Sequence, residues 1–182
     1  MRLIETGFRD LYLIEPHIYN DQRGYFFESF NTMAFKDAGI IFNPVQDNES
    51  RSSRGVIRGL HYQLNPFAQA KLIRVVAGSI FDVAVDLRKG SETYGKWFGT
   101  ELNYDSKRQM FIPRGFAHGF SVLSDYAIIQ YKCDNHYHPA AERSISLADR
   151  TLAIDWKTDM SEAIISPKDS SAPLFKEAEM NF

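Results

Sequence analysis

The sequence predicts an all-β protein, either a sandwich or a barrel. Hydrophobic residues make up 44% of the 182 residues and aromatic residues 14%, which is enough for one sizeable core. Apolar and polar residues alternate at every second position, and turn residues separate the short alternating runs through most of the chain. No change in composition marks a boundary, so residues 1–182 are predicted to form a single domain.

The clearest strand is 81–87. Val83 and Val85 point to one side of it, where the core is expected, and Asp82 and Asp86 point to the other. The turn Ala-Gly-Ser at 77–79 separates this strand from the run before it. Further strands are predicted at 72–76, 96–102, 108–112, 116–123 and 127–133.

Helix signals are few. Asn31 can cap a short helix over 32–38, and Gly39 can end it. A second helical turn is expected at 161–165. From Ala172 onward the chain is polar and is predicted to be loop or a frayed end.

The charge of the chain excludes the basic footprint of a nucleic-acid-binding domain, because the net charge is −2 and the pI about 6.2. The single cysteine, Cys133, cannot form an internal disulfide, which favours a reducing compartment such as the cytoplasm. The N-terminus carries Glu5 and no apolar h-region, so no signal peptide is expected, and no apolar run is long enough to span a membrane.

The strand 58–63 carries the strongest candidates for chemistry together with Lys71. His61 can gain and lose a proton near neutral pH, and a lysine beside it can stabilise negative charge on an oxygen. This pairing suits proton abstraction next to a carbonyl, although a strand histidine can equally be structural. Tyr131 can donate a proton or be a core tyrosine. Asp169 can orient a histidine or be an exposed loop residue, and the sequence does not pair it with His61.

Three further residues can contact a ligand. His118 is predicted to be a second polar group at the cavity, because Gly119 beside it allows close approach. Arg23, in a turn that leads into a strand, and Arg58 can clamp phosphate oxygens, since guanidinium groups suit such anions. The alternative is a pair of solvated surface arginines.

A metal site is not predicted. Small β-barrels often bind a metal through two histidines one residue apart on a strand, but here His61 is followed by Gln63, and an amide is a poor ligand for zinc or iron. His136 and His138 have the spacing but lie beside Pro139 in a polar segment, which is predicted to be a loop.

A set of ordered segments resembles the dTDP-4-dehydrorhamnose 3,5-epimerase family over nearly the whole chain. The segments are 23–28 (RGYFFE), 45–48 (VQDN), 50–63, 71–78, 82–88 (DVAVDLR), 112–120 (IPRGFAHGF), 123–125, 131–132 and 168–169. The resemblance implies a cupin-like jelly roll that forms a homodimer. It also implies a nucleotide-diphosphate 4-keto-6-deoxy sugar as substrate, epimerised at C3 and C5 without a cofactor or metal.

The resemblance assigns roles to individual residues. His61 matches the general base, Asp169 its partner, Lys71 the lysine near the 4-keto oxygen, and Tyr131 the proposed general acid. The positions that match substrate contacts, with the two arginines on the diphosphate, are Arg23, Phe26, Glu28, Gln46, Asn48, Arg58, His118, Tyr137 and Lys168.

Two positions depart from the family pattern and leave the sugar and the number of inverted centres open. Glu49 stands where many relatives carry histidine, and Leu147 where tryptophan is common. One alternative is therefore an epimerase that inverts one centre only or acts on a related nucleotide sugar. Others are a non-catalytic cupin-type sugar-binding module and a metal-dependent cupin enzyme, against which Gln63 argues.

Overall fold

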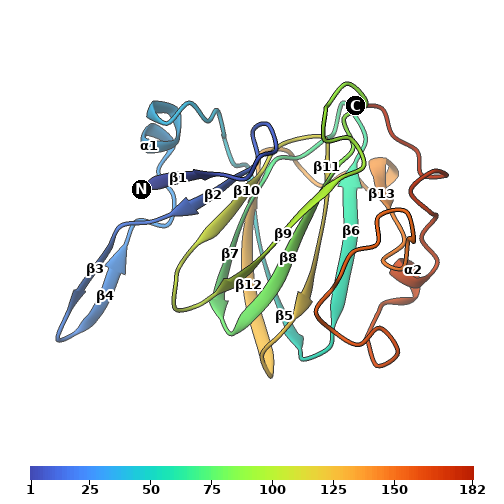
Figure 1. The fold of residues 1–182 in the computed structure, drawn as a ribbon. Helices are drawn as coiled ribbons and strands as arrows, with labels where there is room; N and C mark the ends of the chain where they lie inside the picture. Colours follow the sequence, from blue (N-terminus) through green and yellow to red (C-terminus); the bar gives the residue numbers. More distant parts are fainter.

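Two antiparallel sheets face each other in the computed structural model, which describes residues 1–182 (Figure 1). One sheet has the order β1-β2-β10-β7-β12-β5 and the other β13-β6-β11-β8-β9. The all-β prediction is therefore confirmed. The strands of the two sheets are β1 (Arg2–Glu5), β2 (Tyr12–Glu15), β5 (Gln46–Ser53), β6 (Ile57–Gln63), β7 (Lys71–Ala77), β8 (Ser79–Asp86), β9 (Trp97–Asn103), β10 (Gln109–Ile112), β11 (Phe116–Val122), β12 (Tyr126–Cys133) and β13 (Glu142–Ser144).

The helices are short. In α1 (Thr32–Asp37), the Asn31 side chain accepts hydrogen bonds from the backbone N–H groups of Met33 and Ala34, which confirms the predicted cap. A 3₁₀ turn, η1 (Pro139–Ala141), leads into β13. No helix has the length and hydrophobicity needed to cross a membrane.

The predicted helical turn at 161–165 is wrong. Ile164 instead forms a parallel β-bridge with Val56. The helix α2 (Pro167–Ser170) begins after this bridge, because Pro167 fits the first helical turn and the Ser166 side chain accepts the Asp169 N–H.

The predicted turn at 77–79 is the point where the chain passes from one sheet to the other. Gly78 has φ +76°, and a Cβ there would lie 2.1 Å from the carbonyl oxygen of Tyr126, so only glycine fits. The chain leaves β7 and enters β8 of the facing sheet, and their inward residues, including Ile73 and Ile80, share the core between the sheets.

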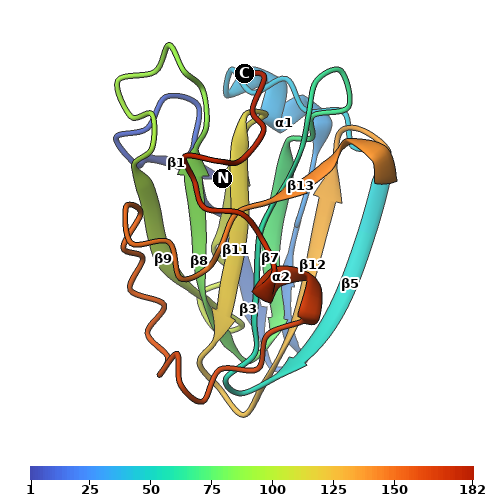
Figure 2. The same ribbon diagram turned by 90° about the vertical axis from the view of Figure 1, so that its right-hand side faces the viewer.

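A second core lies on the outer face of the five-stranded sheet, which residues 145–182 cover (Figure 2). Val83 and Val85 belong to this second core and are fully buried, which confirms their predicted place in a core, whereas Ala84 lies in the core between the sheets. Both faces of β8 are covered, which is why its alternation does not tell the inner face from the outer. The aspartates of the inner face are held by partners: Asp82 by His118, and Asp86 by Arg88.

From Ala172 onward the C-terminal segment has no helix or strand, as the predicted loop requires, but it packs against the sandwich and is not a frayed end. Phe175 is only 8% exposed and its backbone N–H donates to Asp149 Oδ2 at 2.7 Å. Tyr62 donates to the carbonyl oxygen of Glu179 at 2.7 Å. Ala178, Met180 and Phe182, at every second position of this segment, also pack against the second core.

Replacing Phe175 with alanine is expected to destabilise the fold by about 3–5 kcal/mol, because the ring leaves a cavity in the second core. Urea unfolding measures the change. Leu174→Ala is the matched control, since Leu174 is 48% exposed and its loss is expected to cost little. If Phe175→Ala lowered the free energy of unfolding as little as Leu174→Ala does, the tail would not stabilise the sandwich.

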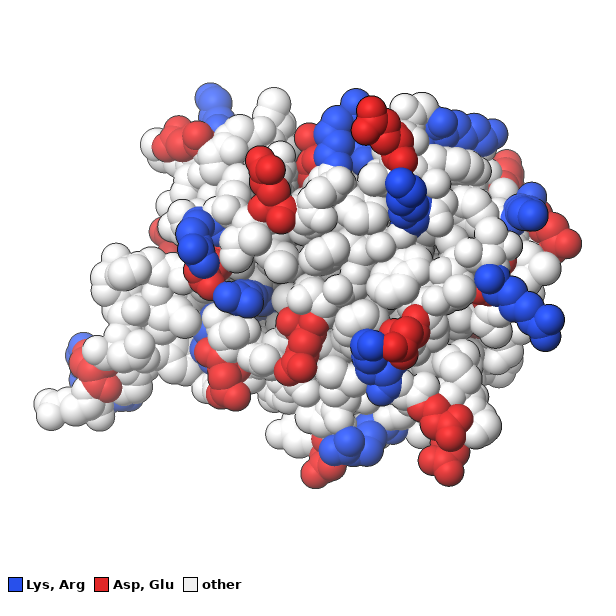
Figure 3. Space-filling model, in the orientation of Figure 1, with Lys and Arg blue, Asp and Glu red and all other residues white.

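A third feature is a hairpin of β3 (Ile18–Asp21) and β4 (Gly24–Phe27), whose strands pair only with each other. It projects from the sandwich in Figure 1, and in Figure 3 it is an arm at the lower left with charged side chains near its tip. Tyr19 and Phe26, opposite each other in the hairpin, are 61% and 68% exposed. Two strands alone are marginally stable, so this arm has an apolar surface without a partner in the same chain.

Candidate active site

Polar side chains from both sheets meet at a cavity of about 120 Å³. The six-stranded sheet contributes β5, β7 and β12, and the five-stranded sheet contributes β6 and β13. The lining residues are Gln46, Asn48, His61, Tyr62, Gln63, Gln69, Lys71, Tyr131, Cys133, Tyr137 and Glu142.

His61 lines this cavity because its neighbour Leu60 packs into the second core on the other face of β6. His61 Nε2 lies 2.6 Å from Oδ1 of Asp169, which is 4% exposed. Burial would raise the pKa of Asp169, but the hydrogen bond and charge of His61, together with hydrogen bonds from Ser166 and Gly59, hold this pKa below the usual 3.8. The buried carboxylate orients the ring, and the second nitrogen of His61 remains available to a ligand.

The lowered pKa of Asp169 sets a pH dependence of stability. A carboxyl whose pKa is lower in the folded than in the unfolded state stabilises the fold above the unfolded value, near 3.8, and this stabilisation is lost as the pH falls through the folded value. The difference in unfolding free energy between the wild type and Asp169→Asn is therefore expected to shrink on acidification. Urea unfolding over a series of pH values measures it, and a difference that grows in acid would contradict the assignment.

Lys71 and Tyr131 reach the cavity from the facing sheet, on the adjacent strands β7 and β12. Burial lowers the pKa of the Lys71 ammonium, and the carboxylates of Asp82 and Glu142 oppose that shift. Burial raises the pKa of the Tyr131 phenol, so it is protonated at neutral pH. The cavity thus has an imidazole on one sheet and an amine and a phenol on the other.

An amide network forms another wall. Gln46 Nε2 donates to Asn48 Oδ1 at 2.9 Å, and Gln46 Oε1 accepts the Tyr137 N–H at 2.9 Å. Asn48 Nδ2 lies 3.9 Å from the sulfur of Cys133, which is buried as its apolar surroundings predict. These contacts fix the polar groups before any ligand binds.

Sequence reasoning missed Glu142. It lies in the three-residue strand β13. Its carboxylate accepts a hydrogen bond from the Tyr137 phenol at 2.8 Å and forms an ion pair with Lys168. Burial opposes the shift, but Lys168 and Tyr137 lower the pKa of Glu142, so it is charged. No motif marks this residue in the sequence, because its place depends on pairing between Glu142 and Gln63 at the sheet edge.

Two predicted residues lie near the cavity without lining it. His118 is 9% exposed, pairs in register with His61, and its Nε2 lies 2.7 Å from Asp82 Oδ1. Arg58 is exposed and donates to Ser52 Oγ at 3.0 Å. Its positive charge opposes the burial that raises the pKa of Tyr131.

Three predicted residues are not brought to the cavity of their own chain. Arg23 forms an exposed ion pair with Asp21 at the tip of the hairpin, and Phe26 points to solvent. Glu28, at the base of the hairpin, accepts a hydrogen bond from Asn31.

Neither departure from the family pattern reaches the cavity. Glu49 is exposed and accepts a hydrogen bond from Gln130 at 2.8 Å. Leu147 is buried in the second core, where its carbonyl oxygen accepts the indole N–H of Trp156. An indole side chain is therefore present beside Leu147, supplied by another position in the sequence.

No group of three or more His, Cys, Asp or Glu side chains is arranged to hold a metal ion. The amide of Gln63 is fully used by the backbone, since it donates to the carbonyl oxygens of Phe67 and His136 and accepts the His138 N–H. Residues 136–138 form a loop, as predicted.

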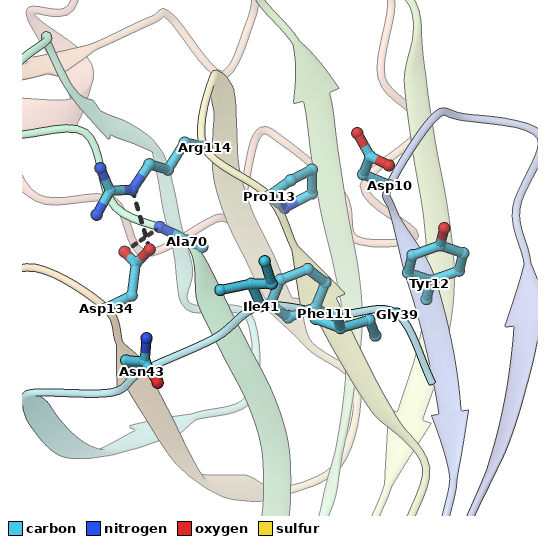
Figure 4. A pocket seen from close by; sticks show the side chains of 11 residues that line it. Asp10, Tyr12, Gly39, Ile41, Asn43, Ala70, Phe111, Pro113, Arg114 and Asp134 are labelled. Atoms are coloured by element: carbon cyan, nitrogen blue, oxygen red, sulfur yellow. Dashed lines mark hydrogen bonds and ion pairs between the residues drawn. The ribbon is translucent and has the colours of Figure 1, made fainter. Parts of the chain in front are cut away.

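A larger cavity, of about 550 Å³, lies on the side of the six-stranded sheet that α1 covers (Figure 4). Tyr12 and Phe111 line it, and Arg114 forms an ion pair with Asp134 in its wall. Asp134 also accepts the Ala70 N–H at 2.7 Å, which fixes the chain just before Lys71. None of the predicted site residues lies here, so the smaller cavity is the candidate site.

Comparison with known proteins finds relatives that match nearly the whole chain. A profile of the family described as dTDP-4-dehydrorhamnose 3,5-epimerase matches residues 5–177. The dTDP-4-dehydrorhamnose 3,5-epimerase of Shigella flexneri is 48% identical over 180 residues, which is 98% of each chain. The crystal structure of a dTDP-6-deoxy-D-glucose-3,5-epimerase from Legionella pneumophila, in complex with dTDP-4-keto-L-rhamnose, is 50% identical. It has a TM-score of 0.92 and covers 97% of this chain and 93% of that one.

A 3'-monoepimerase from Streptomyces bikiniensis, in complex with dTDP-quinovose, has the same fold but is less similar, with 35% identity and a TM-score of 0.86 over 92% of this chain and 84% of that one. The shared architecture is the cupin-like jelly roll, which confirms the predicted fold. Because the profile spans most of the sequence and the 3,5-epimerases align almost from end to end, the chain belongs to the dTDP-4-dehydrorhamnose 3,5-epimerase family.

Proposed function

We propose that this protein epimerises C3 and C5 of a dTDP-linked 4-keto-6-deoxy sugar, converting dTDP-4-dehydro-6-deoxyglucose to dTDP-4-dehydrorhamnose. The observation that carries the proposal is that His61 and Tyr131 enter one cavity from opposite sheets. Lys71 lines the same cavity, on the strand next to that of Tyr131. Epimerisation needs a proton removed from one face of the sugar and another delivered to the opposite face. Groups on facing sheets meet that requirement.

The chemistry follows from the C4 ketone, which makes the protons on C3 and C5 acidic. His61, oriented by Asp169, takes a proton, and the electron pair of the broken C–H bond forms an enolate whose oxygen the Lys71 ammonium stabilises. Tyr131 then gives its proton to the same carbon from the other face. Solvent restores both groups, so the step needs no redox cofactor and no metal.

Incubation with dTDP-4-keto-6-deoxyglucose in heavy water tests this proposal. Deuterium in the product at both C3 and C5 is the expected result. Deuterium at one carbon would identify a single-centre epimerase, the type represented by the 3'-monoepimerase relative. No deuterium would favour a sugar-binding module. The same reaction after chelation tests the metal-dependent alternative, and we expect no loss of activity.

The cavity of one chain is too small for the whole substrate, since nucleotide-sized ligands occupy pockets of about 300–1,000 Å³. Arg23 and Phe26, which match substrate contacts, lie on the projecting hairpin, and β5 is an unpaired edge strand beside the cavity. Open edges and lone hairpins are normally covered. We propose that the protein is a homodimer in which each hairpin extends to the partner's cavity, where Arg23 joins Arg58 on the diphosphate.

Mixing two inactive variants tests this dimer. The double variant Arg23→Ala/Phe26→Ala has a defective hairpin, and His61→Asn has a defective base. Co-expression is expected to restore about a quarter of wild-type activity, because half of the random dimers are mixed and each of these has one intact site. If the hairpin serves its own chain, the mixture stays inactive although the variants associate.

The remaining assignments follow from the same observations. Gln46, Asn48, Tyr137 and Lys168 are proposed to hold the substrate at the cavity wall and rim, and His118 to support His61 from the neighbouring strand. A single domain over residues 1–182 is supported by the C-terminal segment that packs on the sandwich. The cytoplasm stays a prediction from the lone Cys133.

A further inference from the structure

A buried lysine connects the hairpin to the sandwich. Lys107, in the turn between β9 and β10, is 7% exposed and forms no ion pair with a carboxylate. Its ammonium lies 3.0 Å from the ring centroid of Tyr104 and 4.0 Å from that of Tyr25, which belongs to β4. Buried lysines are rare without a carboxylate partner, so two aromatic rings are the groups that hold this charge.

The backbone also favours a defined role for this lysine. Lys107 has φ +54°, a conformation that costs energy for a residue other than glycine. The turn therefore directs the side chain to the space between the two rings, which are 6.1 Å apart and nearly perpendicular. The Tyr104 hydroxyl and the Lys107 ammonium beside it lower the pKa of the Tyr25 phenol, so the contact also alters the chemistry of this group.

Lys107 contacts only one face of the hairpin, the face that carries Tyr25. Tyr25 and Phe27 face the sandwich, where the Arg74 guanidinium lies 5.8 Å from the Phe27 ring. Phe26 points the other way, to solvent. Fixing the inner face therefore fixes the direction in which Phe26 and the tip with Arg23 project.

We propose that Lys107 is a positioning residue: clamped between Tyr25 and Tyr104, it sets the angle at which the hairpin leaves the sandwich and so delivers Arg23 and Phe26 to the partner's cavity. This inference rests on the proposed dimer. Lys107 touches neither the cavity nor its lining residues, so its effect on catalysis passes through the hairpin alone.

The test replaces Lys107 with methionine, which keeps the apolar stem and removes the charge. KM is expected to rise about tenfold while kcat changes less than about twofold, because the base and acid are untouched. Backbone amides of residues 18–27 should exchange with heavy water faster, and the Tyr25 phenol should titrate at higher pH by ultraviolet absorbance. Lys107→Arg is expected to restore much of the KM.

Lys157→Met is the matched control. Lys157 also has a positive φ, +56°, and lies near one aromatic ring, but its side chain is half exposed and far from the hairpin in sequence. If Lys107→Met does not fold, Tyr25→Leu removes the clamp from the other side and Tyr25→Phe keeps the ring.

The readouts separate two failures. Unchanged exchange and unchanged KM in Lys107→Met would overturn the clamp itself. Faster exchange in the hairpin with unchanged KM would overturn delivery to the partner and, with it, the proposed dimer site.

Discussion

His61→Asn is expected to abolish both deuterium exchange at C3 and C5 and product formation, with a loss of about 10²- to 10⁴-fold in kcat. Asparagine keeps the size and polarity of the side chain and can still contact Asp169, but it cannot accept a proton near neutral pH. Without proton removal there is no enolate, so exchange and inversion must fall together. Exchange measured by mass spectrometry and product measured by chromatography give the two rates.

A second histidine provides the control. His136 is exposed in the loop before η1. Its backbone carbonyl accepts a hydrogen bond from Gln63 of the cavity lining, but its side chain has no contact with Asp169, so His136→Asn is expected to keep wild-type rates. If His61→Asn still exchanged deuterium at C3 or C5, another group must remove that proton. Glu142 is the nearest candidate, since it lines the same cavity as a charged carboxylate.

The strands that sequence reasoning found are those with their own hydrophobic pattern. The predicted strand 127–133 matches β12 because its apolar residues alternate around Ile129. Its partner β5, Gln46–Ser53, was missed because the segment QDNESRSS has no apolar residue. It is a strand because each of its eight positions pairs with β12. The two strands lie far apart in the sequence, so their pairing depends on the whole fold rather than on local propensity.

In the candidate site, too, residues with a local sequence signal could be predicted, and contacts set by the three-dimensional fold could not. His61 and Lys71 were recognisable as chemistry-bearing residues, but their meeting with Tyr131 depends on how two sheets stack. Asp169 lies 108 positions from His61, and only the bridge and cap that precede α2 place it there. The family resemblance supplied this pairing, whereas Glu142, whose place depends on an edge strand of three residues, was found only in the structure.

Tyr131→Phe is expected to separate proton removal from inversion. Phenylalanine keeps the ring and its packing in β12 but has no proton to give. His61 can still take a proton from the sugar and return it to the same face after exchange with solvent, so deuterium should still enter the substrate. Inversion should fall by about 10²-fold or more, because the opposite face has lost its acid.

The ratio of deuterium incorporation to product formation is therefore the decisive quantity. It should rise sharply in Tyr131→Phe and stay at the wild-type value in Tyr126→Phe, a change on the same strand at a residue that is 42% exposed and outside the cavity lining. The burial that raises the pKa of Tyr131 keeps the phenol protonated, so the wild-type ratio should not change between neutral and mildly alkaline pH.

If Tyr131→Phe lost exchange as completely as His61→Asn, the phenol would be needed for proton removal as well. If it inverted the sugar at the wild-type rate, the acid would be another group, and Tyr137, which donates to Glu142 at the same cavity, would be the next to replace.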